Sequence, residues 1–271
     1  MSEKFFRGTQ SQARESIKTH CQIQWSCVVS FVYFAQAMKF KIFQSEMKGE
    51  YKKALINADM VFIDGIAMQI FDRVWQRFFK PKPRQRSHNL NGTDFLPFIL
   101  KQTQDKKVGI ILSTVYDPTL GKWPEWMEKG VAELKRQYPH IEIMFAHQTE
   151  FKDRGQDFPF KKLSTLLQQQ QSDYDHILFL NGIGWPVQEI WTEQHRDFFD
   201  NSGLIILNNG ATIDYYSGFE TRAPERIVKM RVGETFRRII TQPKKNLHKF
   251  FAMFQIIPYW GYVVKKRLKK L

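Results

Sequence analysis

The sequence is poor in cysteine, with only Cys21 and Cys27 among 271 residues. Two thiols form neither a disulfide framework nor a complete zinc site, and we expect both to be buried and free. The seven histidines are scattered, without the spacing of a metal-binding pair. These absences argue against a disulfide-stapled secreted domain, and we predict that the protein needs no metal and no cofactor.

An apolar secretory signal is also missing, because the first residues, Met1–Gly8, are polar for the most part. The polar character continues, and we predict a loosely ordered leader over residues 1–24. Without a signal segment, the body of the protein is expected in the cytoplasm.

Acidic residues are scarce near the C-terminus. From Arg226 to Leu271 there are 13 lysines and arginines but one acidic residue, Glu234, so this stretch carries +12 of the formal net charge of +14. Residues 1–225 hold 28 basic and 26 acidic residues, a balance of only +2. The charge is therefore confined to one end of the chain.

The basic end also contains an apolar stretch, Phe250–Val264, interrupted by Gln255 and Pro258. As a helix it would measure about 22 Å, short of the roughly 30 Å hydrocarbon core of a membrane. Basic groups on both sides of an aromatic-rich stretch are typical of segments that lie on anionic membranes. We predict that residues 225–271 form a basic amphipathic appendage, which places the protein peripherally on the inner face of the plasma membrane.

Two other interpretations of this appendage stay open: packing against the body or a partner chain, and binding to nucleic acid. Nucleic-acid arms rarely carry so many apolar residues between their charges, and no recognition module is visible. We therefore expect no nucleic-acid partner.

Short apolar runs alternate with helical patterns over residues 25–224. This alternation predicts an α/β core: a Rossmann-like, mostly parallel sheet with helices on both faces. Ligands of such sheets bind beyond the carboxyl ends of the strands. Four polar turns are expected at that edge: Asp64-Gly65, Ser113-Thr114, Asn181–Gly184 and Asn208–Gly210.

Two of these turns carry candidate chemistry. Asp64 ends an apolar run and precedes a glycine that permits close approach, which suits a general base, although an aspartate that caps the next helix looks the same. The segment Asn181–Glu189 places two glycines before a helix whose free N–H groups can bind an anion. By contrast, Asp173 and Asp175 precede their strand, at the wrong edge for a catalytic metal pair.

Six motifs follow one another along the chain: Asn57–Gly65 (NADMVFIDG), Gly92–Asp94 (GTD), Gly182–Glu189 (GIGWPVQE), Gly210–Asp214 (GATID), Arg222–Pro224 (RAP) and Glu234–Arg238 (ETFRR). In this order they resemble the WecG/TagA/CpsF family of glycosyltransferases, to which N-acetylmannosaminyltransferases belong. The resemblance covers roughly residues 28–250. Each motif is short, so the specificity of the resemblance comes from the occurrence of all six motifs in this order.

The resemblance implies an inverting, metal-independent glycosyltransferase of surface polysaccharide biosynthesis. Such an enzyme moves an N-acetylhexosamine-type sugar, similar to N-acetylmannosamine, from a UDP donor to a polyprenyl-diphosphate-linked acceptor. It also implies a peripheral membrane protein whose C-terminal appendage helps to close the site. Self-association into a homo-oligomer is a further expectation.

By this resemblance Asp64 deprotonates the acceptor hydroxyl, and Gln188 contacts the donor. Without a metal, the leaving diphosphate needs protein cations, which the resemblance places at Arg238, Lys245 and His248. The other residues expected to bind substrate are Ser30, Gly65, Gly92, Asp94, Asn181, Gly184, Pro186 and Glu189.

The sequence departs from the family pattern at several donor contacts. A Thr-x-Asn motif falls on Ser30–Val32, an arginine is replaced by Asn89, and a glycine-rich turn reads Ser113–Tyr116. These departures indicate a divergent member with another sugar or reduced activity.

Because of these departures, a function other than catalysis also stays open. A non-catalytic, membrane-associated scaffold or sugar-nucleotide-binding protein of the same fold would tolerate them. The retention of Asp64, Gln188 and Arg238 favours the enzyme.

Overall fold

The computed structural model describes residues 5–24, 26–39, 49–79, 87–210 and 212–220, together with residues 261 and 265. Its described strands form one seven-stranded sheet of order β1-β3-β2-β7-β6-β4-β5, in which all neighbours run parallel. The strands are β1 (Phe5–Phe6), β2 (Cys27–Tyr33), β3 (Met60–Asp64), β4 (Val108–Tyr116), β5 (Ile141–Glu150), β6 (His176–Gly182) and β7 (Ile205–Asn208).

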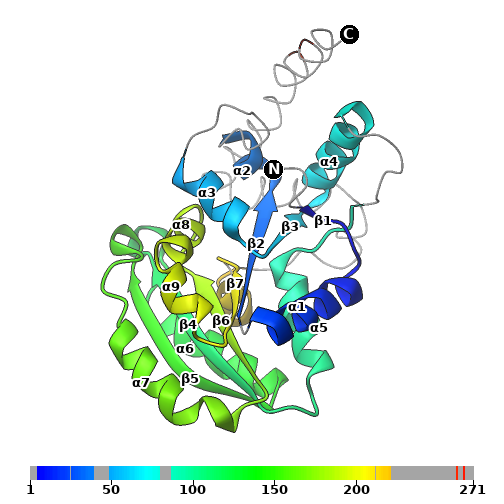
Figure 1. Cartoon of the computed structure of the whole chain (residues 1–271). Coiled ribbons are helices and arrows are strands. Elements are labelled where there is room, and N and C mark those ends of the chain that lie inside the picture. The colour runs from blue at the N-terminus through cyan, green and yellow to red at the C-terminus, as the bar shows by residue number, and fades with distance from the viewer. Residues whose placement is uncertain are drawn as a thin grey trace.

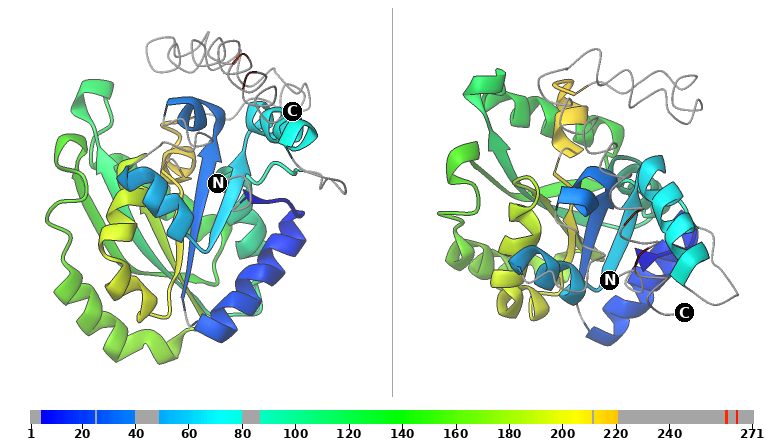
Figure 2. Two further views of the ribbon diagram at one scale, coloured as in Figure 1. Left: turned by 45° about the horizontal axis from the view of Figure 1, so that its top comes forward. Right: turned by 90° about the horizontal axis from the view of Figure 1, so that it is seen from above.

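Helices cover both faces of the sheet, as the alternating pattern predicts (Figure 1 and Figure 2). Buried side chains of α3 (Glu50–Asn57), α4 (Ile66–Phe79), α7 (Phe160–Gln170), α8 (Val187–Gln194) and α9 (Arg196–Asp200) pack on one face. Those of α1 (Gln10–Gln24), α5 (Gly92–Gln102), α6 (Glu125–Gln137) and α10 (Thr212–Ser217) pack on the other. A short helix, α2 (Phe34–Lys39), follows β2 directly. The predicted α/β class is confirmed.

Strand β2 shows why the apolar runs are nearly continuous. Val28 and Val32 are buried in one core, whereas Val29 and Phe31 are buried in the other. Successive side chains of a strand point to opposite faces, so a strand covered on both faces must be apolar at almost every position.

The prediction of a loosely ordered leader is wrong for residues 5–24. Phe5 and Phe6 pair with Val61 and Phe62 of β3 as an edge strand, and α1 follows. Ala13 and Ile17 of α1 are buried in the core on the face of the sheet that α5, α6 and α10 also cover. They lie four residues apart, hence on one side of the helix, and two apolar positions in a polar segment are a weak sequence signal.

The helix α5 begins at Gly92, and the residue before it, Asn91, is its N-cap. Asn91 has extended backbone (φ −67°, ψ 145°), and its side chain accepts a hydrogen bond from the Asp94 N–H at 2.8 Å. This is the geometry of an N-cap, and the helix therefore begins at the residue after Asn91.

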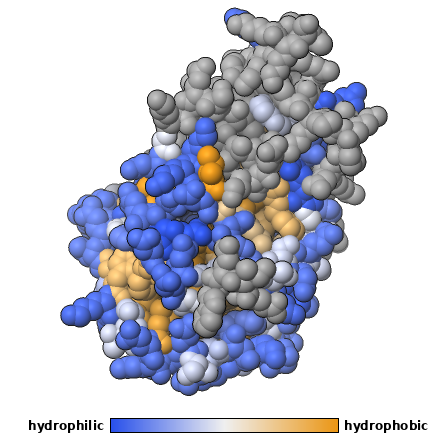
Figure 3. All heavy atoms as spheres, viewed as in Figure 1, coloured by the Kyte–Doolittle hydropathy of each residue, from blue (hydrophilic) through white to orange (hydrophobic). Residues whose placement is uncertain are grey.

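Hydrophilic residues cover most of the described surface that Figure 3 shows, with apolar patches between them. No helix within the described ranges is both long and apolar enough to cross a membrane. The predicted appendage lies outside the described residues except for residues 261 and 265, so its role stays a prediction.

Candidate active site

Asp64 is the last residue of β3 and stands beside Tyr33, the last residue of β2, in the strand register. Gly65 follows with φ 82°, a left-handed conformation that favours glycine, and a Cβ placed on it would meet no atom of the described residues within 4 Å. The Gly65 N–H donates a hydrogen bond to Asn89 Oδ1 at 2.7 Å. Asn89 thus holds the turn that presents the half-buried Asp64 at the carboxyl edge of the sheet.

Tyr33 connects Asp64 to the glycine-containing segment that follows β6. Its ring packs against the Trp185 ring in an edge-to-face arrangement, with centroids 5.5 Å apart. Burial raises the pKa of Tyr33 well above its ordinary range, and the nearby carboxylates of Glu189 and Asp64 raise it further. The predicted base and the predicted donor-binding segment therefore meet around one tyrosine.

A buried polar network joins the middle of β2 to the carboxyl ends of β6 and β7. Asn181 Nδ2 donates to Asn208 Oδ1 at 3.0 Å, to Thr192 Oγ1 at 3.1 Å and to the Gln188 carbonyl at 3.2 Å. Thr192 Oγ1 lies 2.9 Å from Asn208 Oδ1, and Asn208 Nδ2 donates to Ser30 Oγ at 3.1 Å. Ser30 and Asn181, which the resemblance assigns to substrate binding, thus lie within this network, each at most 1% exposed.

The side chain of Gln188 has a fixed orientation. Its Nε2 donates to the Asn208 carbonyl and to Glu189 Oε1, both at 2.9 Å. The two N–H bonds are thereby used, and Oε1 is left as a buried acceptor with no partner among the described residues. Buried polar atoms are nearly always satisfied, so an oriented acceptor of this kind suits a ligand that donates a hydrogen bond.

Glu189 is enclosed completely by the protein. Burial raises the pKa of its carboxyl to about 7, although the hydrogen bond from Gln188 acts in the opposite direction. The charge of this carboxyl also contributes to the raised pKa values of Tyr33 and Tyr51. The structure places Glu189 behind Gln188, as a partner that orients the amide.

Three glycines line the space between the ends of β4, β6 and β7, and we call them the glycine junction: Gly182, Gly184 and Gly210. A Cβ on Gly210 would lie 3.1 Å from Gln188 Oε1 and 3.6 Å from the Gly184 Cα. A Cβ on Gly182 would lie 3.1 Å from the Ser113 carbonyl. The absence of a side chain at Gly210 leaves the buried Gln188 acceptor in contact with backbone alone on this side.

The remaining predicted residues differ in their surroundings. A Cβ on Gly92 would collide with the Asn209 side chain, so this glycine lets α5 pack against the turn after β7. Asp94 accepts a hydrogen bond from Asn91 Nδ2 at 2.6 Å in the first turn of α5. Pro186 precedes α8 and is joined to Trp185 by a cis peptide bond. The predicted cations Arg238, Lys245 and His248 lie outside the described residues.

Sequence reasoning missed Tyr33 and Thr192 and gave Asn208 no role of its own. Tyr33 ends an apolar strand and reads as one more core aromatic. Thr192 lies in the middle of a helical pattern, four residues after Gln188. Only the placement of strand ends side by side brings these polar groups together.

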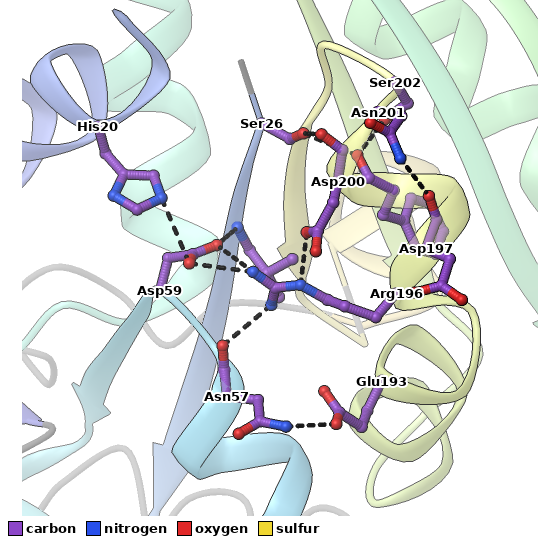
Figure 4. Close-up of polar contacts among 12 residues, drawn as sticks. His20, Ser26, Asn57, Asp59, Glu193, Arg196, Asp197, Asp200, Asn201 and Ser202 are labelled. Carbon is purple, nitrogen blue, oxygen red and sulfur yellow. Dashed lines mark hydrogen bonds and ion pairs between the residues drawn. The ribbon is translucent and has the colours of Figure 1, made fainter. Parts of the chain in front are cut away.

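A second polar cluster lies at the opposite edge of the sheet (Figure 4). Arg196 Nη2 is 3.1 Å from both oxygens of Asp59, and the Val28 N–H donates to Asp59 Oδ2 at 2.7 Å. His20, Cys27 and Asp59 have potential metal-ligand atoms within 4.8 Å of one another. A guanidinium already pairs with this carboxylate, so the cluster has the character of a structural ion pair.

The sequence model of the family described as "Glycosyl transferase WecG/TagA/CpsF family" matches residues 4–271. The chain belongs to this family. A curated relative is the N-acetylglucosaminyldiphosphoundecaprenol N-acetyl-beta-D-mannosaminyltransferase of Bacillus subtilis (strain 168), 23% identical over 194 residues. The matched region covers 72% of this chain and 65% of that relative. Membership of the WecG/TagA/CpsF family agrees with the resemblance that the ordered motifs indicated.

Proposed function

We propose that this protein is an inverting, metal-independent glycosyltransferase of surface polysaccharide biosynthesis. It transfers an N-acetylhexosamine-type sugar, similar to N-acetylmannosamine, from a UDP donor to a polyprenyl-diphosphate-linked acceptor. Family membership supports the reaction class, and the relative's name supports the sugar and the lipid-linked acceptor. The observation that carries the proposal is the position of Asp64 at the carboxyl edge, beside Tyr33, whose ring packs against Trp185 in the segment that leads to Gln188.

In the proposed reaction Asp64 removes the proton of the acceptor hydroxyl. The oxygen attacks the anomeric carbon from the side opposite to the leaving group, the bond to the donor diphosphate breaks, and UDP leaves with the electron pair. A single displacement inverts the anomeric configuration. Cations near the diphosphate stabilise its developing charge, the role that the resemblance gives to Arg238, Lys245 and His248.

The donor contacts proposed for Gln188 follow from its orientation. Its available function is a carbonyl oxygen, so it suits an N–H or O–H group of the nucleotide sugar. Gly210 places no side chain beside this oxygen, so a ligand at the glycine junction would meet it there. The departures at Ser30–Val32 and Asn89 change the surroundings of the sugar and are consistent with a different donor.

We also propose that the protein docks on the anionic inner face of the membrane. Besides residues 225–271, helix α4 supports this, because it begins directly after Asp64-Gly65 at the carboxyl edge. Its outward face carries Ile70, 54% exposed, together with the exposed Arg73. Its single acid, Asp72, is buried and pairs with Arg7 at 2.7 Å. An apolar and basic face suits an anionic lipid surface.

The experiment that tests the function is a panel of nucleotide sugars, measured by thermal shift and calorimetry with and without EDTA. Stabilisation by one UDP-sugar, unchanged by EDTA, is the expected result and names the donor. Failure of every sugar nucleotide to bind a folded protein would favour the non-catalytic scaffold instead.

A further inference from the structure

Arg154 lies on the loop between β5 and α7, in a tight turn. Its backbone has φ −53° and ψ 133°, and Gly155 follows with φ 81°. The Gln156 N–H donates to the Asp153 carbonyl at 3.0 Å, which closes a turn of type II geometry with Arg154 at its first central position. The left-handed glycine required at the second position is Gly155.

The turn rests directly on helix α8. A Cβ on Gly155 would lie 2.9 Å from Trp191 Cδ1 and 3.5 Å from Ile183 Cδ1. Trp191 is itself 3% exposed and belongs to the main core. Arg154 therefore projects from a point that the core fixes in place.

The guanidinium of Arg154 lies over an aromatic ring at the glycine junction. Its Cζ is 4.0 Å from the centroid of the Phe151 ring. A Cβ on Gly184 would lie 3.3 Å from Arg154 Nη1 and 3.7 Å from Phe151 Cε2. The missing side chain of Gly184 is what allows the cation to approach the backbone before α8.

This cation has no counter-charge among the described residues. Across those ranges no carboxylate pairs with Arg154, and burial lowers the pKa of its guanidinium. Lys152, two residues earlier, differs in both respects: its side chain is 69% exposed and pairs with Glu150 at 3.1 Å. A partly buried arginine held against a ring and lacking a carboxylate is suited to bind an anion through its planar fork.

The position of this cation identifies the anion. Gly184 lies near both polar groups. Its own Cβ position is 3.3 Å from Arg154 Nη1, and its Cα is 3.6 Å from the Gly210 Cβ position, which lies 3.1 Å from Gln188 Oε1. A nucleotide sugar at the glycine junction would meet a hydrogen-bond acceptor and a guanidinium together. We propose that Arg154 binds the diphosphate of the donor, an inference that rests on the proposed function.

The test uses the full chain and compares Arg154→Gln with Lys152→Gln, which removes the same charge two residues away. UDP affinity is measured by calorimetry and uridine affinity by ligand-observed NMR. A charge-assisted bidentate contact predicts that Arg154→Gln weakens UDP binding about 10- to 100-fold. Uridine binding should not change, and Lys152→Gln should retain UDP affinity within about twofold, since an exposed ion pair contributes little.

A second variant separates the planar fork from the charge. Arg154→Lys keeps the charge but loses the fork and its ring contact, so we expect an intermediate loss of UDP affinity. Equal losses for uridine and UDP would assign Arg154 a structural role and overturn the inference. Unchanged UDP affinity in Arg154→Gln would also overturn it while leaving the proposed function intact. If the unmodified protein bound no UDP, the proposed function would fail first.

Discussion

The two edges of the sheet carry polar clusters of opposite character. At the amino edge, the Asp59 carboxylate accepts from the Val28 N–H and from Arg196, and the Arg196 guanidinium also reaches Asp200 and the Asn57 carbonyl (Figure 4). The charges of Asp59, Arg196 and Asp200 are therefore paired with one another. At the carboxyl edge, Gln188 Oε1 has no partner in the described structure, and Arg154 has no carboxylate there.

This difference separates stability from function. Where buried charges are paired, the pairing offsets the free-energy cost of burying them. Where a buried polar group has no partner, that cost remains until a ligand binds. Groups at the carboxyl edge are therefore expected to control binding and turnover. Groups at the amino edge are expected to control the free energy of unfolding.

The largest effect is expected at Asp64. Asp64→Asn keeps the size of the side chain but removes the base, so turnover should fall at least ~100-fold, the scale of general base catalysis. UDP-sugar affinity and the thermal unfolding midpoint should remain near those of the unmodified protein. Full retention of turnover would rule out Asp64 as the base, and lost donor binding would assign it a different role.

The second prediction concerns Glu189→Gln and the pH dependence of the free energy of unfolding. The folded-state pKa of about 7 exceeds the ordinary 4.5, so the folded protein binds more protons between these values and its stability falls as pH rises. The loss is complete above pH 7 and amounts to about 3 kcal/mol. A glutamine at this position does not titrate, so the variant should gain about this much relative to the unmodified protein between pH 4 and 8.

Urea unfolding of both proteins at pH 4, 6 and 8 measures this difference. Parallel stability profiles would show that Glu189 is not held neutral by burial. The introduced glutamine can still accept the hydrogen bond from Gln188, so the affinity for UDP-sugar should change little. Replacement of Glu189 by methionine removes that acceptor and provides the contrast.

At the amino edge, Arg196→Met is expected to lower stability by about 2 kcal/mol, because it leaves the half-buried Asp59 without its guanidinium partner. The Arg196 side chain is 22% exposed, which limits the effect below that of a fully buried pair. The Michaelis constant for the donor should stay the same. A change in that constant, with stability unaltered, would contradict the division between the two edges.

The parallel sheet and the position of Asp64 follow from local patterns: apolar runs, turn residues and the order of motifs. The leader does not, since Phe5 and Phe6 acquire meaning only as partners of β3. Arg154 is another case. Gly155 beside it predicts only a turn, whereas its role depends on Gly184, 30 residues later along the chain.

The smallest effect compares two exposed isoleucines at opposite edges. Ile70 of α4 is 54% exposed near the carboxyl edge, and Ile56 is 39% exposed at the end of α3 that leads into the amino edge. If the carboxyl edge faces the membrane, Ile70→Asp should weaken binding to anionic vesicles about fivefold, because a partly buried isoleucine contributes about 1 kcal/mol. Ile56→Asp adds the same charge and should leave vesicle binding unchanged. Equal losses in sedimentation with vesicles would mean that added negative charge alone weakens binding, and α4 would then have no special contact with the lipid.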